Sequence, residues 1–413
     1  MTDLEVEAIS YLRTPAAIRE RCNHLFHLAC EEQLRYFRID LTRLDTVADY
    51  VLTVIHDQYP DFQIPFHSRW RHFEVGEVPR LAELNEAIAD LAPLAQAKVK
   101  FDLAITSVLL DAGAGSAWQY YEPETGEVYR RSEGLAVASF RMFCQGFFSS
   151  DPDFPFQADA AGLQRLNPLI LAAGFQVTEE NPLAGLEGRV HLLQTLGKVL
   201  SEHPLLFGGG NLRPGNLARY FRDSRFSGIN RIQAVEVFSA ILTGFSEIWP
   251  GRSEIAGVNL GDVWVHPALP GDRPGEQLIP FHKLSQWLTY SLLEPLTELG
   301  LEVTDLEELT GLAEYRNGGL CLDLGLLVAK DPSIFQTPHS PDSEVIVEWR
   351  ALTVSLLDRI AEVIRQKLNL TALELPLVKI LQGGTWTAGR RIASELRPGG
   401  RPPLQIESDG TVF

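Results

Sequence analysis

The chain of 413 residues lacks any run of about 18 consecutive apolar residues, the length at which a membrane-spanning helix is expected. It starts with Met-Thr-Asp-Leu-Glu, which is acidic and lacks the basic and apolar regions of a secretory signal. The sequence therefore predicts no membrane partner and no signal peptide, and we expect a cytoplasmic location.

Basic residues are few compared with acidic ones. Lys and Arg number 36, Asp and Glu number 54, and the formal charge is -18. A protein that grips a nucleic-acid backbone needs clustered Lys and Arg, so we expect no nucleic-acid partner. A small phosphorylated ligand is compatible with this charge, because one or two local cations suffice to hold it.

Cysteine is also scarce, and the four residues show no C-x-x-C spacing: Cys22, Cys30, Cys144 and Cys321. Because each lies in an apolar context with helical periodicity, we expect them to be reduced and buried as small hydrophobic side chains. Hydrophobic residues make up 45% of the chain and charged residues 22%, which is typical of an ordinary globular protein rather than a disordered or fibrous one.

Apolar residues recur with the period of an α-helix over most of the chain. Helices are expected at residues 15–38, 43–58, 80–91, 93–111, 132–149, 189–202, 215–222, 231–248 and 343–369. Residues 59–74 are rich in proline and aromatic residues without a period and predict an ordered loop. Strand signals predict two short hairpins, 263–265 with 278–279 and 404–406 with 411–413. The predicted fold is mainly α, with several helices and small β-hairpin decorations.

The length allows two or three domains, or one large domain. We expect an N-terminal helical region at residues 1–150 and a helical region at 151–413 that carries the site, or one continuous domain that spans both. The sequence leaves the oligomeric state open.

Motifs for cofactors and metals are incomplete. The glycine-rich residues 208–216 lack the G-K-[ST] ending of a P-loop, which favours a plain surface loop. Residues 111–116, Asp-Ala-Gly-Ala-Gly-Ser, fit neither a dinucleotide fingerprint nor a nucleophile elbow. His24 and His27 share a helical face near Cys30, but a third ligand at conventional spacing is missing. We therefore expect no cofactor and no metal.

Residues 279–319 place two charged clusters, Phe281-His282-Lys283 and Glu314-Tyr315-Arg316, at the ends of an apolar helical stretch. Thr304 to Glu307 fits a capping box that opens a short helix, and Asn317-Gly318-Gly319 fits the turn that closes it. Glu314 is then expected near a helix C-terminus, where the helix dipole disfavours a carboxylate. Such a cost suggests a functional use. A solvent-facing ion pair on two amphipathic helices is the alternative.

Two further places offer candidate residues. Trp264 follows Asp262 in the first predicted hairpin and could stack on a ligand or simply pack in the hairpin. Glu348 and Arg350 open the long predicted helix, where they form either a supporting shell for the site or a salt-bridged surface.

Four segments resemble, in order, landmarks of the queuosine 5′-phosphate N-glycosylase (queuosine salvage) family: Phe281-His-Lys-Leu-Ser-Gln286, Thr304 to Thr310, Ala313-Glu-Tyr-Arg316 and Glu348-Trp-Arg-Ala351. The resemblance covers about residues 280–365. It implies a helical core like that of DNA glycosylases, with Lys283 and Glu314 in the site. Two departures, Glu314 where those enzymes have Asp and Asn317-Gly318-Gly319 where they have Val-Pro-Gln, imply a reshaped pocket, and we do not expect a queuine-sized base.

A more specific resemblance spans nearly the whole chain. Segments that carry it are Arg13 to Arg19, Leu109 to Gly115, Arg141-Met-Phe143, Arg213-Pro-Gly-Asn216, Glu314 to Gly319 and Ser408 to Phe413. They resemble the uracil-catabolism protein 4 (Urg3-like) family of fungi and bacteria. Members of that family are linked to uracil degradation through a ribosylated urea intermediate.

Together the resemblances imply an N-glycosidase that hydrolyses the C1′–N bond of a small ribosyl 5′-phosphate, with ribosylurea 5′-phosphate as the candidate substrate. Glu314 would stabilise the sugar cation and activate water, and Lys283 would pair with Glu314 or hold the phosphate. The substrate-binding residues would be His282, Tyr315, Arg316, Asp262 and Trp264, supported by Glu348 and Arg350. The alternatives are a metabolite sensor without turnover and a urea-amide hydrolase that uses a metal or a Cys or Ser nucleophile.

Overall fold

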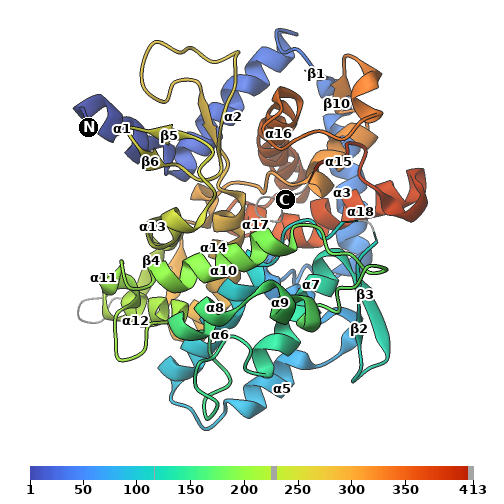
Figure 1. Cartoon of the computed structure of the whole chain (residues 1–413). Helices are drawn as coiled ribbons and strands as arrows, with labels where there is room; N and C mark the ends of the chain where they lie inside the picture. The colour runs from blue at the N-terminus through green and yellow to red at the C-terminus, as the bar shows by residue number, and fades with distance from the viewer. Residues whose placement is uncertain (116, 225–229, 408–413) are drawn as a thin grey trace. The chain divides into compact units, whose positions relative to one another are not determined.

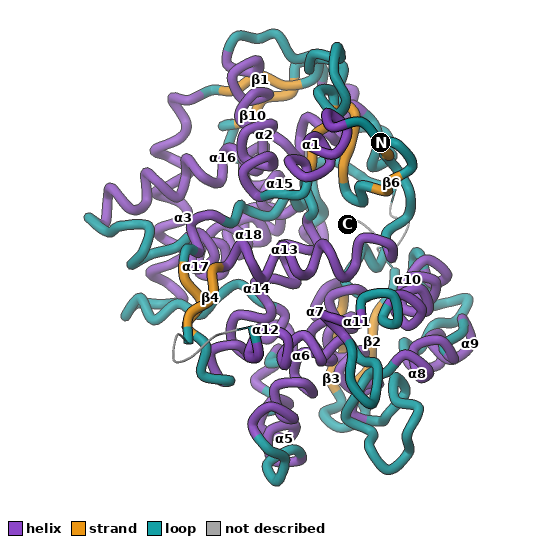
Figure 2. The backbone as a smooth tube through the Cα atoms, turned by 90° about the vertical axis from the view of Figure 1, so that its left-hand side faces the viewer, coloured by secondary structure: helices purple, strands orange, loops and turns teal. Residues whose placement is uncertain are grey.

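The computed structural model describes residues 1–115, 117–224 and 230–407. Helices dominate these residues, and the strands form two-stranded pairs (Figure 1, Figure 2). The predicted mainly α fold is confirmed. Among the described helices, none has both the length and the apolar character that a bilayer crossing requires.

The described residues form two compact units, each assembled from separate stretches of the chain. The first unit contains residues 1–67, 251–286 and 305–407, and the second contains residues 68–250 and 287–304. Helix α14 (Lys283–Glu298) begins in the first unit and ends in the second.

The first unit is organised around the long helix α16 (Glu344–Leu368), against which α2 (Pro15–Cys30), α3 (Leu44–Gln58) and α15 (Tyr315–Asp323) pack. The predicted helix at 343–369 is therefore confirmed. The other elements of this unit are α1 (Asp3–Leu12), β1 (Phe37–Ile39), η1 (Leu41–Arg43), β5 (Glu254–Ile255), β6 (Val258–Asn259), β7 (Val263–Val265), β8 (Leu278–Pro280), η5 (Leu306–Glu308), β10 (Leu327–Ala329), η6 (Pro332–Phe335), α17 (Leu377–Ile380), η7 (Leu381–Thr385), α18 (Trp386–Leu396) and η8 (Pro398–Gly400).

Helix α16 is buried on more than its apolar stripe. The apolar residues spaced along one side of this helix are buried, apart from the partly exposed Val363: Val345, Trp349, Leu352, Leu356, Ile360 and Ile364. Residues on its other sides are buried as well. A helix covered on all sides is a core helix, and the polar side chains that it carries inward must find partners there. The helix ends at Asn369, which has φ 55° and takes the left-handed conformation common after a helix.

The first predicted hairpin is confirmed. Strands β7 and β8 pair antiparallel, with Val263 opposite Pro280 and Val265 opposite Leu278. A small apolar cluster joins this hairpin to α1 and the β5–β6 pair: Ile9, Leu12, Ile255, Leu260, Val263 and Leu278. The hairpin therefore has its own hydrophobic anchor in the first unit. In the second predicted hairpin, residues 411–413 lie outside the described residues.

The second unit is centred on α6 (Pro93–Leu109), which is almost entirely buried from Val99 onward. Its other elements are α4 (Arg69–Phe73), η2 (Val75–Glu77), α5 (Arg80–Ala87), β2 (Gln119–Glu122), β3 (Glu127–Arg130), α7 (Arg131–Cys144), α8 (Ala160–Arg165), α9 (Pro168–Gly174), α10 (Leu186–Val199), α11 (Pro204–Phe207), η3 (Pro214–Asn216), α12 (Leu217–Asp223), β4 (Arg231–Gln233), α13 (Ala234–Phe245), η4 (Ser246–Ile248) and β9 (Glu302–Thr304). Buried ion pairs join residues of this unit that are distant in sequence, such as Arg80 with Glu122 and Arg69 with Asp111.

The glycine-rich residues 208–216 combine a surface loop with a buried anchor. Residues 209–211 are exposed, as expected of a surface loop. Pro214, Gly215 and Asn216 are instead buried. The carboxylate of Asp102 on α6 accepts the amide N–H of Gly215 and pairs with Arg213. The family segment Arg213 to Asn216 is therefore held against α6.

Several expectations are wrong in detail. The helix predicted at 15–38 ends at Cys30, and residues 37–39 form β1 instead, paired with β10. The loop predicted at 59–74 contains the short helix α4. All four cysteines are free, but Cys30 is exposed and Cys144 is partly exposed, so burial holds for Cys22 and Cys321.

Candidate active site

Asp262, which precedes β7, ties the hairpin to α16. Its carboxylate accepts both arms of the Arg350 guanidinium, with Nη1–Oδ1 at 2.7 Å and Nη2–Oδ2 at 2.8 Å. Trp264 Nε1 also donates to Oδ1 at 2.6 Å, and the backbone N–H of Lys283 donates to Oδ2 at 2.9 Å. Burial disfavours the ionised carboxylate, but Arg350 and these bonds outweigh burial and hold the pKa of Asp262 well below its usual range. Asp262 is therefore an ionised carboxylate whose orientation is fixed by Arg350, Trp264 and the backbone of Lys283.

Asp262 also directs the chain into α14. Its backbone carbonyl accepts the N–H groups of Phe281 and His282, at 2.9 and 3.3 Å. His282 has φ 45°, an uncommon left-handed conformation for a non-glycine residue. Its Nε2 lies 2.9 Å from the carbonyl oxygen of Leu12, which can only accept, so Nε2 carries the proton. Burial lowers the pKa of His282, so this ring is neutral and anchors the turn.

Lys283 is the first residue of α14, and Asp262 fixes its backbone. Its side chain is buried, and its positive charge is close enough to lower the pKa of Glu314. Both residues belong to the first unit, and the catalytic roles of Lys283 and Glu314 stay predictions.

Glu314 is the N-cap of α15, with φ -123° and ψ 163°. Its Oε2 accepts the N–H of Arg316 at 2.7 Å, and its Oε1 accepts the N–H of Asn317 at 2.6 Å. Burial raises the pKa of Glu314, while the two backbone bonds and the charges of Lys283 and Arg316 pull it down less strongly. The result is a buried, oriented carboxyl group with a raised pKa.

The predicted placement of Glu314 near a helix C-terminus is wrong, because Asn317, Gly318 and Gly319 lie inside α15 rather than in a closing turn. A Cβ on Gly318 would lie 2.7 Å from both Trp349 Nε1 and Thr353 Oγ1, so the glycine permits α15 to approach α16. The predicted capping box is also wrong. Asp305 has φ 57°, and its side chain does not cap the short helix η5.

The two residues after Glu314 serve the packing of α15. Arg316 is buried, donates from Nη1 to the carbonyl of Gly400 at 2.8 Å, and lies over the ring of Tyr315. Gly389 of α18 packs directly on the backbone carbonyl of Arg316. The substrate-binding roles of Arg316 and Tyr315 stay predictions. At least one N–H group of the Arg316 guanidinium already binds within the protein, to the carbonyl of Gly400.

Glu348 holds the segment before β1. It is fully buried, and its carboxylate accepts three backbone N–H groups, those of Arg35, Tyr36 and Phe37, at 3.1 to 3.2 Å. A carboxylate that accepts so many backbone donors is a structural clamp. Its expected role in support of the site is therefore indirect, through the fold of α16.

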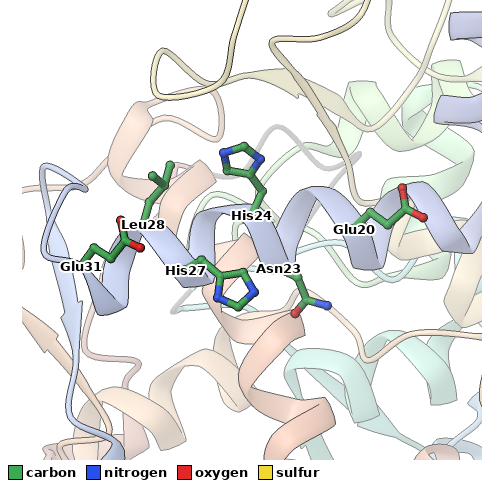
Figure 3. Close-up of a pocket in the computed structure, with 6 residues that line it drawn as sticks. All are labelled: Glu20, Asn23, His24, His27, Leu28 and Glu31. Carbon is green, nitrogen blue, oxygen red and sulfur yellow. The ribbon is translucent and has the colours of Figure 1, made fainter.

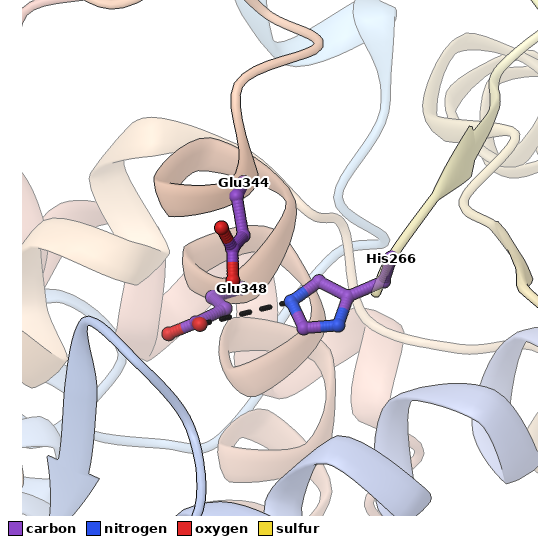
Figure 4. Close-up of side chains that lie close together, drawn as sticks. All are labelled: His266, Glu344 and Glu348. Carbon is purple, nitrogen blue, oxygen red and sulfur yellow. Dashed lines mark ion pairs between the residues drawn. The ribbon is translucent and has the colours of Figure 1, made fainter. Parts of the chain in front are cut away.

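His266, Glu344 and Glu348 form the one group in the described part of the chain with spacing suited to a metal ion (Figure 4). His266 Nδ1 accepts the N–H of Ala268 at 3.2 Å, and Nε2 faces Glu348 at 3.7 Å. A metal would need the lone pair of Nε2. Glu348, the carboxylate that faces Nε2, already accepts three backbone N–H groups, so it serves the fold of the first unit.

The face of α2 that carries His24 and His27 borders a shallow hollow of about 520 Å³. Its lining residues recur every three or four positions along one helix: Glu20, Asn23, His24, His27, Leu28 and Glu31. Figure 3 shows the rings of His24 and His27 pointing to different sides of α2. Neither histidine belongs to the metal-like group around His266.

Comparison with known proteins decides the family. The family described as "Protein of unknown function (DUF1688)" matches residues 11–413. The chain belongs to the DUF1688 family. It is 43% identical to "Protein urg3" of Schizosaccharomyces pombe, over 99% of this chain and 100% of that protein. It is 37% identical to "Uracil catabolism protein 4" of Lachancea kluyveri, over 98% of this chain and 99% of that protein. The Urg3-like resemblance is confirmed, and the queuosine-salvage resemblance stays a prediction.

Two buried polar side chains in the same segments as Glu314 and Lys283 were not predicted as site residues from the sequence. Asn317 is fully buried, and neither its Nδ2 nor its Oδ1 has a hydrogen-bond partner in the structure. Gln286, one helical turn after Lys283, donates from Nε2 to Thr310 Oγ1 at 2.8 Å, but its Oε1 has no partner. Each such group costs about 1–3 kcal/mol, so it requires an explanation. If the sequence had been interpreted with α15 beginning at Tyr315, Asn317 would have been expected three residues after Glu314, on the same face of the helix.

The DUF1688 structure thus brings most of the predicted residues into one connected set. Asp262 contacts Trp264, Lys283 and Arg350 directly, and Lys283 is electrostatically linked to Glu314. Arg350 also donates from Nε to the carbonyl of Ala313 at 3.4 Å, immediately before Glu314. Glu348 lies apart from these contacts and is directed to residues 35–37.

Proposed function

We propose that this chain is an enzyme of uracil catabolism that hydrolyses the C1′–N bond of a small ribosyl 5′-phosphate. The candidate reaction takes ribosylurea 5′-phosphate and water to ribose 5-phosphate and urea. The metabolic context is supported by a relative that carries the name "Uracil catabolism protein 4" and matches nearly full length. The reaction type is supported by the chemistry of Glu314.

Glu314 has the properties needed beside a developing sugar cation. Cleavage of an N-glycosidic bond builds positive charge on the ribose, which a nearby carboxylate stabilises. Its two backbone bonds fix the orientation of the group and occupy one acceptor position on each oxygen. A carboxylate has about four such positions, so each oxygen can still accept a further proton donor, such as a water.

The raised pKa of Glu314 suits proton transfer. A general base works best when its pKa approaches the working pH, and burial moves this carboxyl group in that direction. Lys283 and Arg316 oppose the shift, so they help to keep the group ionised. In the reaction, Glu314 accepts a proton from water, the water oxygen bonds to C1′, and the C1′–N electron pair leaves with the nitrogen. The proton held by Glu314 then passes to that nitrogen, which gives neutral urea and restores the carboxylate.

The cysteines argue against the competing hydrolase that uses a thiolate nucleophile. Burial raises the pKa of Cys144 and of Cys321 to about 12, and it raises the pKa of Cys22 and Cys30 as well. Since the thiolate is the nucleophile, a thiol that stays protonated at neutral pH is a poor choice. The oriented carboxyl of Glu314 is the better-equipped group.

Replacing Glu314 tests the proposal. The chain is incubated with ribosylurea 5′-phosphate, and ribose 5-phosphate is measured by mass spectrometry. Glu314→Gln keeps the size of the side chain and one acceptor oxygen but removes the charge and the base. We expect turnover to fall by about 10²- to 10⁴-fold, the usual contribution of general base catalysis. Undiminished turnover in this variant would remove Glu314 from the mechanism.

Asp159→Asn is the matched control. Asp159 is also a buried N-cap carboxylate, on α8 of the second unit, and it accepts the backbone N–H groups of Gly162 and Ser150 at 2.9 and 2.7 Å. Both variants replace an N-cap carboxylate by an amide that keeps one acceptor oxygen, so both change the helix cap in the same way. Asp159→Asn should keep its turnover, so a loss confined to Glu314→Gln reports chemistry rather than capping.

A further inference from the structure

Asn317 stands out among the buried side chains of the first unit. It is the third residue of α15, 0% exposed, and its backbone N–H is bound to Glu314. Among the residues that the structure describes, neither polar atom of the side-chain amide has a hydrogen-bond partner, so the amide contributes nothing to this arrangement. A leucine has the same branched arrangement of side-chain heavy atoms and does not carry this cost, so the amide calls for a use outside the fold itself.

The chemistry of the amide defines what could satisfy it. Oδ1 accepts and Nδ2 donates, side by side in one plane. The complementary ligand presents an N–H beside a C=O, as a ureido group or the edge of a pyrimidine dione does. Phosphate and carboxylate groups do not fit, because an ionised oxyanion has no N–H to offer the acceptor.

A second buried amide points to the same ligand chemistry. Gln286 lies on the first turn of α14, three residues after Lys283, and Nε2 is held by Thr310. Its remaining atom, Oε1, is an acceptor without a partner. The first turn of α14 therefore carries Lys283 and the acceptor Oε1 of Gln286, which is unpaired among the described residues. The first turn of α15 follows the N-cap Glu314 and carries Asn317, whose amide is likewise unpaired. Each of the two positions calls for a partner that donates an N–H group.

We propose that Asn317 recognises the nitrogen leaving group of the substrate by pairing its amide with a ureido or related N–H/C=O edge. This inference rests on the proposed function and adds to it the residue that recognises the leaving group. It also gives a use to one of the positions at which the chain departs from the queuosine-salvage pattern, the Asn-Gly-Gly segment at 317–319. The phosphate and ribose would be bound by other groups.

The test compares Asn317→Leu with the unmodified full-length chain. The affinities for ribosylurea 5′-phosphate and ribose 5-phosphate are measured by calorimetry, and both chains carry Glu314→Gln to prevent turnover. We expect Asn317→Leu to weaken binding of the ureido compound by about tenfold or more, because one or two buried hydrogen bonds are lost. Binding of ribose 5-phosphate, which lacks the ureido group, should change little.

Stability separates recognition from structure. Asn317→Leu should melt at the same temperature as the unmodified chain or higher, since it removes unpaired polar atoms. Asn216→Leu is the control, because buried Asn216 donates to the carbonyls of Phe207 and Asn211. That variant should lose stability and keep its affinity for the ureido compound. Asn317→Ala serves as a second variant if the leucine does not fit.

The outcomes also separate this inference from the proposed reaction. If the unmodified chain binds but does not cleave the ureido compound, and Asn317→Leu loses that binding, recognition stands and the reaction fails. If hydrolysis occurs and both Asn317 variants bind like the parent, the reaction stands and recognition is overturned, leaving a buried water as the partner of the amide. Failure of the unmodified chain to bind the ureido compound also overturns the inference.

Discussion

Asp262→Asn would test whether one carboxylate holds the candidate site together. The side chain of Asp262 is 13% exposed and that of Arg350 is 1% exposed. In Asp262→Asn the guanidinium of Arg350 stays buried. Its two N–H groups then face an amide that offers one acceptor oxygen and one NH2 donor in place of two acceptor oxygens. Trp264 and the backbone of Lys283 share the same carboxylate, so they lose part of their partner as well.

Removal of one member of a buried ion pair typically costs about 3–5 kcal/mol, because the remaining charge has no partner. Asparagine keeps the size and one acceptor of aspartate, so we expect the lower end of this range for Asp262→Asn. Asp358→Asn is the control on the same helix as Arg350. Its partner is Arg19, at 2.8 Å, and the two side chains are 23% and 30% exposed. A pair this accessible contributes about 1 kcal/mol or less.

The effect should depend on pH with a defined sign. The pKa of Asp262 is lower in the folded than in the unfolded chain, where an aspartate titrates at about 3.9. Its stabilisation is therefore complete above that value and is lost as the pH falls through the lowered pKa. Urea unfolding followed by circular dichroism should show a constant difference between Asp262→Asn and the parent at neutral pH, and a smaller one in strong acid. A difference no larger than that of Asp358→Asn, or one that persists unchanged in acid, would refute this reasoning.

Two further substitutions address the site and its packing. Lys283→Ala should raise KM by about tenfold or more for phosphorylated substrate and much less for its dephosphorylated form, if the ammonium binds phosphate through a charge-assisted bond; equal effects on both compounds would contradict that role. Gly318→Ala should destabilise the chain by about 1–3 kcal/mol in thermal or urea unfolding, because its Cβ would lie 2.7 Å from Trp349 and Thr353. Gly210→Ala, where a Cβ would meet no atom within 4 Å, is the control and should be nearly neutral.

Periodicity was enough to predict the regular parts of the fold. The helix expected at 343–369 is α16 within a residue at each end, since its apolar stripe is long and Asn369 is a natural stop. The hairpin of β7 and β8 also has local signals, with short apolar runs on both sides of a turn-rich segment. Local sequence decides such elements, and tertiary contacts only reinforce them.

Prediction failed where tertiary packing overrides local preference. Gly318 and Gly319 indicate a helix end by their propensity, yet α15 continues through them because α16 approaches at Gly318. This error placed Glu314 at the wrong end of a helix and hid Asn317. The ion pair of Asp262 and Arg350 joins residues 88 positions apart in the sequence, so local sequence patterns could not predict it.

The π-helical turn η7 has a consequence for how this family can change. Residues Leu381–Thr385 wind with one residue more than a regular turn would hold, directly before α18. Deleting one of them would restore an ordinary α-helix but rotate everything that follows by about 100°. Gly389 would then leave the carbonyl of Arg316, and a bulkier side chain would meet α15 in its place. Natural deletions should therefore avoid this turn, whereas substitutions that keep its length can be accommodated.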